Sequence, residues 1–479
     1  MGANYLAILP EISLAVLAAL LILIDLRLKP ERKHILPGLT AGGLLLVLVA
    51  TLLFARPAAG AGESIWGGML RHDLAAYIFR IIFLFGAAAT AILTQGWKTV
   101  ERRGEFYVLL VLSTLGMTLM AASADLIMLF LAIETASIPL YVMAGFMTSD
   151  DKSTEAGVKY LLFGAATSAV MLYGFSLLYG FAGTTDLYEL SAAAAAGDLP
   201  VLGLAGVLVL ALAGFGFKVA VVPFHFWAPD VYEGAPTPVT AFLSTASKAA
   251  GFAVILRFLL AAYPLEVANW GGLVAVMAVV SMTVGNAAAL AQKNIKRLLA
   301  YSSIAHAGYI LMGIAAGTVL GATGVVYYLA VYLVTNMAAF AVVIIFFNVV
   351  GSDDIASYAG LSRRHQGLAF AMLVAFLSLA GVPPLGGFFA KILVFAAAVE
   401  ANLVWLAIAG VLNAILGLYY YLMVLKVIYL DRSEDESKPL PVRRSHMAVL
   451  VVCLVLVLVL GTVLGPLYDW STIAAGGLF

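Results

Sequence analysis

Residues 213–227 read AGFGFKVAVVPFHFW, an apolar stretch that contains one charge, Lys218, and one proline, Pro223. Two more lysines stand alone in similar surroundings: Lys248 in FLSTASKAAGFAVIL and Lys391 in PPLGGFFAKILVF. A charge at the centre of a bilayer costs ~2.5–3.5 kcal/mol even on the scale taken from insertion experiments, and residues of this kind usually serve ion movement. The three lysines therefore predict a protein that moves ions across a membrane.

The composition places the chain in the membrane. Of its 479 residues, 63% are hydrophobic and 11% are charged, and the mean hydropathy is +1.06. The formal net charge is zero, which argues against nucleic acid as a partner, and a single cysteine, Cys453, excludes a disulfide framework and an iron–sulfur cluster held by this chain alone. Apolar runs long enough to cross ~30 Å of hydrocarbon recur throughout. We predict an all-α polytopic membrane protein of about fourteen spans, centred near Leu17, Leu46, Phe83, Leu115, Ile138, Met171, Val209, Gly251, Val279, Leu311, Val334, Leu377, Leu416 and Leu456.

Basic residues alternate between the two sides of these spans. Cytoplasmic loops are rich in Lys and Arg, and here the odd-numbered loops hold them, apart from a short loop after span seven, whereas the other side has only Arg56 and Arg71. We therefore expect both termini on the non-cytoplasmic side. The basic residues are Arg27, Lys29, Arg32 and Lys33 after span one, Lys98, Arg102 and Arg103 after span three, Lys152 and Lys159 after span five, Lys293, Lys296 and Arg297 after span nine, Arg363 and Arg364 after span eleven, and Lys426, Arg432, Lys438, Arg443 and Arg444 after span thirteen.

Two spans contain prolines that should break them. Pro223 lies in span seven, and Pro383-Pro384 lies in span twelve; proline removes a backbone donor, so the broken segments should line a cavity. The two spans are five apart, and five is odd, so a repeat of spans four to eight by spans nine to thirteen would be inverted, as in many transporters. The alternative is coincidence. We expect one membrane domain, divided into 1–104 (three N-terminal helices), 105–263 (first repeat), 264–430 (inverted second repeat) and 431–479 (loop and last helix).

One carboxylate accompanies the lysines. Glu134, in MLFLAIETASIPLYVMAGF, lies five residues before Pro139 near the middle of span five. If spans five and seven are neighbours, Lys218 is its natural partner, and two opposite charges ~6 Å apart attract by ~3 kcal/mol at an effective dielectric of ~20. Making or breaking that pair would load or release a proton. A static buried ion pair is the alternative.

Other ionisable groups are open to two interpretations. His225 follows the span-seven break and His306 lies in YSSIAHAGY; each can relay protons or act as a hydrogen-bonded structural residue. A haem held by two histidines is not expected. Arg80 and Arg257 are interpreted as snorkelling or lipid-contacting side chains near span ends, and Glu11 and Asp25 as structural.

Three segments resemble a known family, the antiporter-like subunits of respiratory complex I. They are residues 216–240, GFKVAVVPFHFWAPDVYEGAPTPVT, followed by Lys248; residues 292–309, QKNIKRLLAYSSIAHAGY; and residues 381–391, GVPPLGGFFAK. Within that family the chain is most similar to subunit N of NADH-quinone oxidoreductase, because of its DVYEGAPTPVTAF loop, its lysine at 391 where subunit M has glutamate, and its end after span fourteen where subunit L would continue into a lateral helix.

The resemblance implies a role in a proton-pumping machine. Glu134 and Lys218 would form the input-side pair, Lys248 the central relay and Lys391 the exit-side lysine. FMN, iron–sulfur clusters and quinone would lie in partner subunits, with no cofactor and no metal in this chain. Its partners would be the antiporter-like and small helical membrane subunits and the lipid of a bacterial plasma membrane.

Three alternatives remain open at this stage. The chain could belong to a multi-subunit cation/proton antiporter, to a redox complex in which it is a non-pumping scaffold, or to a related complex fed by ferredoxin or another reduced donor. Sodium-dependent growth without a link to NADH would favour the first, and pumping that survives neutralised lysines would favour the second.

Overall fold

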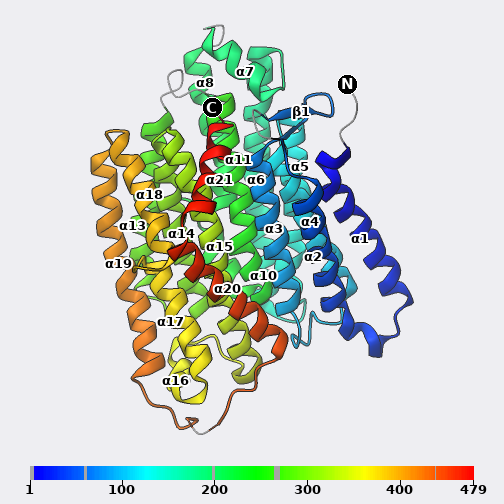
Figure 1. Cartoon of the computed structure of the whole chain (residues 1–479), viewed down its shortest axis with the longest axis vertical. Coiled ribbons are helices and arrows are strands. Elements are labelled where there is room, and N and C mark those ends of the chain that lie inside the picture. The colour runs from blue at the N-terminus through cyan, green and yellow to red at the C-terminus, as the bar shows by residue number, and fades with distance from the viewer. Residues whose placement is uncertain (1–4, 59–61, 197–199, 264–269, 437, 479) are drawn as a thin grey trace.

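The computed structural model describes residues 5–58, 62–196, 200–263, 270–436 and 438–478. Most of them lie in helices that form one bundle (Figure 1). In these ranges twelve helices are long and apolar enough to cross a membrane, and two shorter apolar helices, Gly203–Val219 and Gln366–Ala380, accompany them. The prediction of an all-α polytopic membrane protein is confirmed, and every predicted span centre lies inside a helix.

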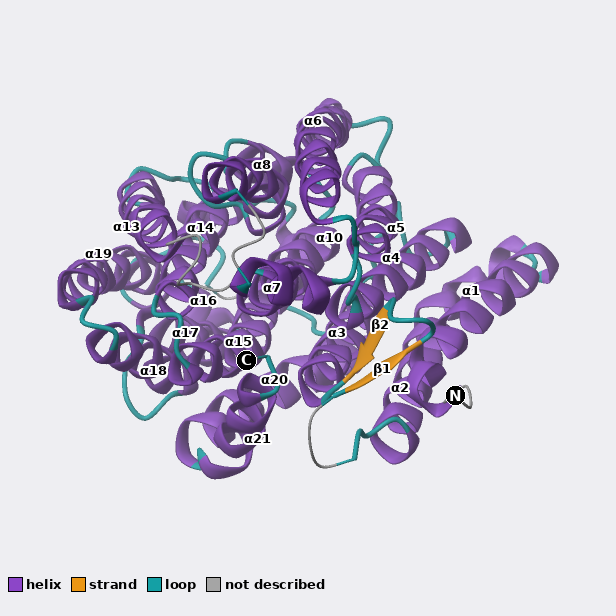
Figure 2. Ribbon diagram, turned by 90° about the horizontal axis from the view of Figure 1, so that it is seen from above, coloured by secondary structure: helices purple, strands orange, loops and turns teal. Residues whose placement is uncertain are grey.

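The first two spans, α1 and α2, lie at one edge of the bundle, opposite α13 and α19, whereas α3 lies further inside (Figure 2). A short hairpin that the sequence did not predict lies between spans two and three, with Glu63 paired to His72 in antiparallel register. The elements of this part are η1 (Tyr5–Ile8), α1 (Leu9–Arg27), η2 (Pro30–Ile35), α2 (Leu36–Phe54), β1 (Glu63–Ile65), β2 (Leu70–His72) and α3 (Leu74–Leu93).

Spans four to eight follow, with span seven in two pieces. Span eight contains two π-helical turns, η3 and η4, which are rare and often lie at functional positions. The elements are α4 (Gly104–Ala122), α5 (Leu126–Ala144), α6 (Asp151–Ala182), α7 (Leu187–Ala195), α8 (Val201–Val219), α9 (Trp227–Gly234), α10 (Thr237–Phe242), η3 (Leu243–Ser247), α11 (Lys248–Arg257) and η4 (Phe258–Ala262).

Spans nine to fourteen complete the bundle, with span twelve in two pieces. A further helix, α21, follows the fourteenth span and was not predicted. The elements are α13 (Trp270–Ala289), α14 (Ile295–Ala315), α15 (Val319–Val350), η5 (Ile355–Tyr358), α16 (Leu361–Arg364), α17 (Gln366–Ala380), α18 (Gly386–Glu400), α19 (Val404–Tyr429), α20 (Arg444–Thr462) and α21 (Gly465–Gly476).

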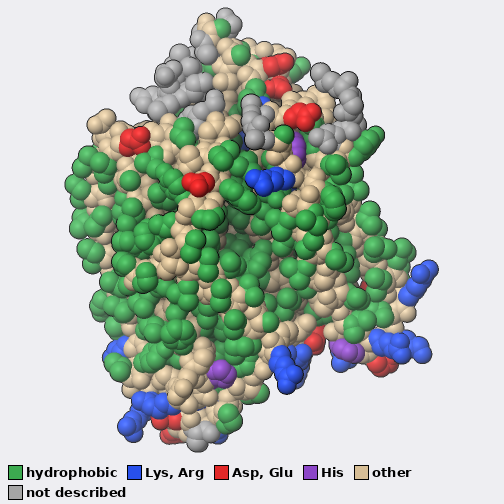
Figure 3. Space-filling model, in the orientation of Figure 1, with side chains coloured by type: hydrophobic (Ala, Val, Ile, Leu, Met, Phe, Trp, Pro, Cys, Tyr) green, Lys and Arg blue, Asp and Glu red, His purple; other side chains and the backbone are tan. Residues whose placement is uncertain are grey.

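The most enclosed helices carry the polar residues. The span Thr237–Ala262 is buried throughout its most apolar window, and α14 and α15 are almost as deeply buried, whereas α1, α6 and α20 expose most of theirs. Figure 3 shows a wide apolar belt, with Lys and Arg side chains along the lower rim, the end of the bundle at which α16 lies. An apolar belt of this kind suits contact with lipid tails. The rim with the basic side chains contains the odd-numbered loops, and we call this end of the bundle the basic end.

The two predicted helix breaks are present. Helix α8 ends at Val219, where Ala220 adopts a left-handed conformation with φ 56°, and α17 ends at Ala380, where Gly381 has φ 88°. A cis X-Pro bond follows in each case, at Val222-Pro223 and at Pro383-Pro384. Backbone groups freed by the breaks find side-chain partners: the Val222 N–H donates to Ser281 Oγ at 3.0 Å and the Gly387 N–H donates to Ser378 Oγ at 3.2 Å.

A second pair of features repeats at the same offset of five spans. Helices α6 and α15, spans six and eleven, each have 32 residues and end at a left-handed glycine, Gly183 or Gly351. An isolated antiparallel bridge follows each of these two helices. The bridge after α6 joins Asp186 to Asp125, and the bridge after α15 joins Asp354 to Asn294. Shared lengths, caps and bridges are what an internal duplication would leave.

Candidate functional site

Glu134 lies in the middle of α5, beside α6. Asp125 caps the start of α5 by accepting hydrogen bonds from the Ile127 and Met128 N–H groups at 2.8 and 3.0 Å. The Glu134 side chain is half-buried, and its Oε1 accepts a 2.6 Å hydrogen bond from the Ser168 hydroxyl of α6. A charge-assisted hydrogen bond of this length is among the stronger polar contacts in proteins. The carboxylate is therefore held toward α6.

Lys218 lies in the last turn of α8 and reaches α5. Its side chain is buried, its Nζ donates to Ser137 Oγ, and the rings of Tyr141 and Phe217 lie 5.4 and 5.2 Å away. Among the described residues, Lys218 and Glu134 form no ion pair, so the Lys218 nitrogen is more than 4.0 Å from either Glu134 oxygen. Ser137 is one turn beyond Glu134 and nearer to the ammonium. The static ion pair is thus not formed in this structure, and each of the two groups is bonded to a serine hydroxyl instead.

Lys248 is the first residue of α11, directly after the π-helical turn η3, and is only 1% exposed. Its Nζ donates a 2.6 Å hydrogen bond to the Ser303 carbonyl oxygen of α14. A Cβ at Gly251, one turn after Lys248, would lie 2.7 Å from Val219 Cγ1. Gly251 therefore lets α11 approach the end of α8, the helix that carries Lys218.

Lys391 lies in α18, just after the span-twelve break, and is buried. Its Nζ donates to the carbonyl oxygens of Leu379 and Ala380 at 2.9 and 2.8 Å. Those carbonyls belong to the last turn of α17, where intrahelical partners are missing and a cation is favoured. The Tyr309 ring centre lies 4.9 Å from the same nitrogen. The break therefore creates the cation site.

His306 of α14 is placed between two of the lysines. Its Nδ1 and the Tyr328 hydroxyl are 2.7 Å apart, and its Nε2 and the Tyr421 hydroxyl are 3.3 Å apart. Ser303, which binds Lys248, and Tyr309, whose ring faces Lys391, each lie one turn from His306 in α14. A histidine bonded through both nitrogens can accept a proton on one and release it from the other.

His225 is not joined to this network. The imidazole stacks on Phe226, with ring centres 4.4 Å apart, and its buried Nδ1 has no hydrogen-bond partner among the described residues. Its backbone carbonyl accepts from the Ala228 N–H at 3.0 Å, which starts the segment after the break. Its observed contacts are those of a structural residue.

Sequence reasoning missed several polar partners. Ser137 contacts Lys218, and Ser168 contacts Glu134. Tyr328 and Tyr421 both contact His306. Serine and tyrosine are common in membrane helices, so composition alone does not single them out. The position of Ser137 one turn after Glu134 was the one signal available.

The interpretation of Arg80 and Arg257 as snorkelling residues is wrong. Arg80 is fully buried and its Nε donates to Glu11 Oε1 at 2.9 Å. Arg257 is 2% exposed and lies 2.8 Å from Asp73 Oδ2, with further bonds to the Ala121 carbonyl and the Tyr188 hydroxyl. Each arginine is far from its carboxylate in sequence, so only the fold could reveal the pairing.

Asp73 is ionised by its surroundings. Burial by itself would raise the pKa of this carboxyl, but the charge and hydrogen bonds of Arg257 hold the pKa below its ordinary value. The carboxylate also caps α3, since its Oδ1 accepts from the Ala76 N–H at 2.8 Å. One side chain thus ties the start of span three to span eight.

A second charged cluster lies at the basic end. Asp230 and Glu233 of α9 contact Lys152, Lys159 and Arg297 at 2.6–3.1 Å. Burial opposes ionisation of Asp230, yet hydrogen bonds from Lys159 and Arg297 keep the pKa of its carboxyl below the ordinary value. The cluster ties α9 to the starts of α6 and α14. Among the described residues, no group of three or more His, Cys, Asp or Glu side chains could hold a metal ion.

Comparison with known proteins places this arrangement in a family. Residues 123–417 match the family model described as NADH:quinone oxidoreductase/Mrp antiporter, TM, and this range contains Glu134 and the three buried lysines. NADH-quinone oxidoreductase subunit N of Moorella thermoacetica is 44% identical over 94% of this chain and 93% of its own length. The chain belongs to the NADH-quinone oxidoreductase subunit N family.

Solved structures agree with this membership. A chain of respiratory complex I from Thermus thermophilus with bound aureothin superposes with a TM-score of 0.82 and 35% identity, covering 96% of this chain and 98% of that one. A chain of the Mrp complex from a Dietzia species has a TM-score of 0.86 over 99% of this chain and 98% of its own, but only 20% identity, so it shows the shared antiporter-like fold alone.

Proposed function

We propose that this chain is a proton-translocating membrane subunit of NADH-quinone oxidoreductase, which couples electron transfer from NADH to quinone in partner subunits to proton movement. The observation that carries the proposal is the state of Lys218, Lys248 and Lys391. All three are buried, and their hydrogen bonds are to neutral oxygens rather than to carboxylates. A buried ammonium without a counter-charge is costly, which suits a group that gains and loses a proton.

The four ionisable residues would act in the order in which the fold arranges them. Glu134 and Lys218 would form the input-side pair, because Lys218 reaches α5 at Ser137, one turn from Glu134. Lys248 would be the central relay, His306 would lie between it and Lys391, and Lys391 would be the exit-side group. For His225, the stacking on Phe226 and the buried Nδ1 without a partner among the described residues support a structural role instead.

The assembly and orientation of the chain are part of the same proposal. FMN, iron–sulfur clusters and the quinone site would be held by partner subunits, among them antiporter-like neighbours and small helical subunits of the membrane arm. The chain would lie in a bacterial plasma membrane with its basic end toward the cytoplasm and both termini on the other side. The division into repeats at 105–263 and 264–430 is supported by the paired breaks and the paired 32-residue helices.

A coupled assay tests this function. In inside-out vesicles that contain the whole complex, NADH should drive quinone reduction together with acidification of the interior, without a requirement for sodium. Replacing each lysine in turn should lower acidification. Proton movement that depends on sodium and not on NADH would instead indicate an antiporter complex.

A further inference from the structure

A groove opens at the basic end of the second half of the chain. It has a volume of about 590 Å³ and lies between α13, α14 and α19, beside η5. Lys293 and Asp354 line it from the loops after spans nine and eleven, and both are exposed. Val427 and Tyr420 also line it, and their separation of seven residues in α19 corresponds to about 10 Å along the helix axis. The groove therefore extends from the basic end into the interior of the bundle.

Tyr420 is the buried polar group at the inner part of this groove. Its side chain is 3% exposed, and its hydroxyl donates to Asn286 Oδ1 at 3.1 Å. The ring of Tyr421 lies 4.5 Å away, centre to centre, so the two phenol rings are in contact. Because a tyrosine hydroxyl both donates and accepts, it can turn from one neighbour to another.

From Tyr420 one branch leads to the relay. The Tyr421 hydroxyl lies 3.3 Å from His306 Nε2 and also bonds to Ser302 Oγ. Tyr328 follows on the other nitrogen of His306. Every member of this branch carries an exchangeable O–H or N–H together with a lone pair, which is what proton transfer along hydrogen bonds requires.

The other branch ends at an amide. The Asn286 Nδ2 group donates to the Asn413 carbonyl oxygen at 3.0 Å and to the Tyr309 hydroxyl at 3.3 Å. A close contact of α13 with α14 holds this geometry, since a Cβ at Gly285 would lie 2.6 Å from the Ala305 nitrogen. A neutral carboxamide accepts a hydrogen bond but does not titrate near neutral pH. Asn286 is therefore a positioning residue that holds the Tyr420 hydroxyl.

We propose that this groove is a second route for protons, leading from the aqueous phase at the basic end through Tyr420 and Tyr421 to His306. It rests on the proposed function, because it delivers protons to the segment between Lys248 and Lys391. In each step a hydroxyl oxygen gains one proton from a hydronium ion or from the preceding hydroxyl and gives its own proton to the next acceptor. Both tyrosines end neutral, and His306 ends with one additional proton.

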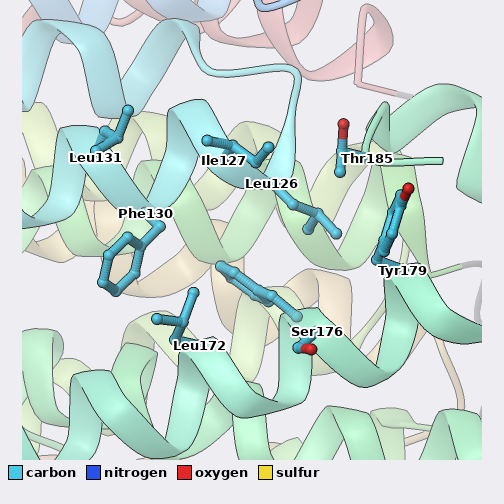
Figure 4. A pocket seen from close by; sticks show the side chains of 9 residues that line it. Leu126, Ile127, Phe130, Leu131, Leu172, Ser176, Tyr179 and Thr185 are labelled. Atoms are coloured by element: carbon cyan, nitrogen blue, oxygen red, sulfur yellow. The ribbon is translucent and has the colours of Figure 1, made fainter.

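A second groove lacks the polar lining that a proton route requires. It has a volume of about 420 Å³, lies between α5 and α6, and is lined mainly by leucine, isoleucine and phenylalanine side chains (Figure 4). Its polar members, Ser176, Tyr179 and Thr185, lie toward the other end of those helices, and none contacts Glu134 or Lys218 in the described residues. An apolar wall of this kind offers no hydrogen-bonded path.

The test compares two tyrosines of α19 in the assembled complex. Tyr420→Phe removes one hydroxyl and keeps the ring, and it should lower the ratio of protons pumped to NADH oxidised several-fold, because the buried hydroxyl between the groove and Tyr421 is gone. Tyr429→Phe is the matched control, since Tyr429 is half-buried in the same helix and does not line the groove. It should pump at the parental ratio.

Access from the basic end can be measured separately. Met423 lines the groove, and the native Cys453 is fully buried. A charged, membrane-impermeant thiol reagent added to the basic side should reduce pumping in the Met423→Cys variant and leave the equally treated parental complex unchanged. Reagent added to the other side should have no effect.

The outcomes separate this inference from the proposed function. If Tyr420→Phe and reagent-treated Met423→Cys both pump at the parental ratio while Lys248→Met does not, the function stands and the groove route is wrong. Equal losses in Tyr420→Phe and Tyr429→Phe would also overturn the route, because they would reflect packing. Parental pumping in Lys248→Met would overturn the proposed function itself.

Discussion

The Nζ of Lys248 in α11 donates a 2.6 Å hydrogen bond to the carbonyl oxygen of Ser303 in α14. That contact joins span eight of the first half to span ten of the second, at a lysine that is 1% exposed and directly follows a π-helical turn. Peptide carbonyls carry no net charge, so the ammonium is solvated here without being neutralised. The Lys248 side chain can therefore both bind a proton and release it.

Lys248→Met should insert and assemble at the parental level and lose most coupled turnover. Methionine has a similar length and cannot titrate, and removing a charge from the membrane interior relieves a cost of ~2.5–3.5 kcal/mol. Lys248→Arg should also be impaired, because guanidinium stays protonated. The measurement is NADH-driven acidification per amount of assembled complex. Parental rates in Lys248→Met would favour the scaffold interpretation.

Glu134→Gln should lower pumping and coupled quinone reduction roughly tenfold or more while the complex still assembles. The amide can still accept the hydrogen bond from Ser168, so the packing of α5 on α6 is kept, but the charge that could draw Lys218 is gone. Glu134→Asp should retain more activity, since it keeps the charge at a shorter reach. A fully active Glu134→Gln complex would show that the carboxylate is dispensable.

Ser137→Ala should also impair pumping. The Ser137 hydroxyl accepts the hydrogen bond from Lys218, and leaving a buried donor unpaired costs about 1–3 kcal/mol, more when it is charged. Thr135→Ala is the control, because the Thr135 hydroxyl bonds only to the Leu131 carbonyl of its own helix. The ratio of protons to electrons distinguishes the two variants. The same ratio in both would mean that Ser137 does not hold the lysine in the working complex.

Asp73→Asn should destabilise the chain by about 3–5 kcal/mol at neutral pH, because it leaves the buried Arg257 without a counter-charge. The pKa of the Asp73 carboxyl is depressed in the folded state, so the stability that it contributes is present above its ordinary value of 3.8 and is lost only as pH falls through the lower folded pKa. The difference between parental and variant complexes should therefore be constant from pH 8 to pH 5.

Thermal inactivation of the solubilised complex measures this difference. Glu155→Gln is a matched control, since Glu155 is 60% exposed in its pair with Lys159 and such pairs contribute about 0–1 kcal/mol. A difference for Asp73→Asn that declines between pH 8 and pH 5 would contradict the assigned ionisation.

A reporter fused to the C-terminus and active only in the cytoplasm should stay silent, and one active only outside it should give a signal. The start of α1 and helix α21 lie at the same end of the bundle, away from the basic rim (Figures 1 and 3). Cytoplasmic loops carry an excess of Lys and Arg, so we expect the basic end on the cytoplasmic side. A bright cytoplasmic reporter would mean that the basic end faces outward, and the direction assigned to the relay would be reversed.

The sequence by itself determined the membrane class, the fourteen spans and the places where two of them break. These properties depend on local chemistry: an apolar run of about 20 residues crosses the bilayer, and Pro223 and Pro384 interrupt hydrogen bonding wherever the helix packs. The same local reasoning singled out Lys218, Lys248 and Lys391, because a lone charge in an apolar run is visible without any partner.

Only the tertiary structure decided what each charge contacts. Glu134 was expected to meet Lys218, yet the hydroxyls of Ser168 and Ser137 lie closer to them, and Arg257 was expected at the lipid surface although Asp73, distant in sequence, pairs with it inside. Hydrogen-bond partners depend on rotation and depth of packed helices to within about 1 Å, since such bonds span only 2.5–3.2 Å. The hydrophobic pattern of the sequence specifies which face of a helix is buried. It does not specify the rotation and depth of that helix relative to its neighbours.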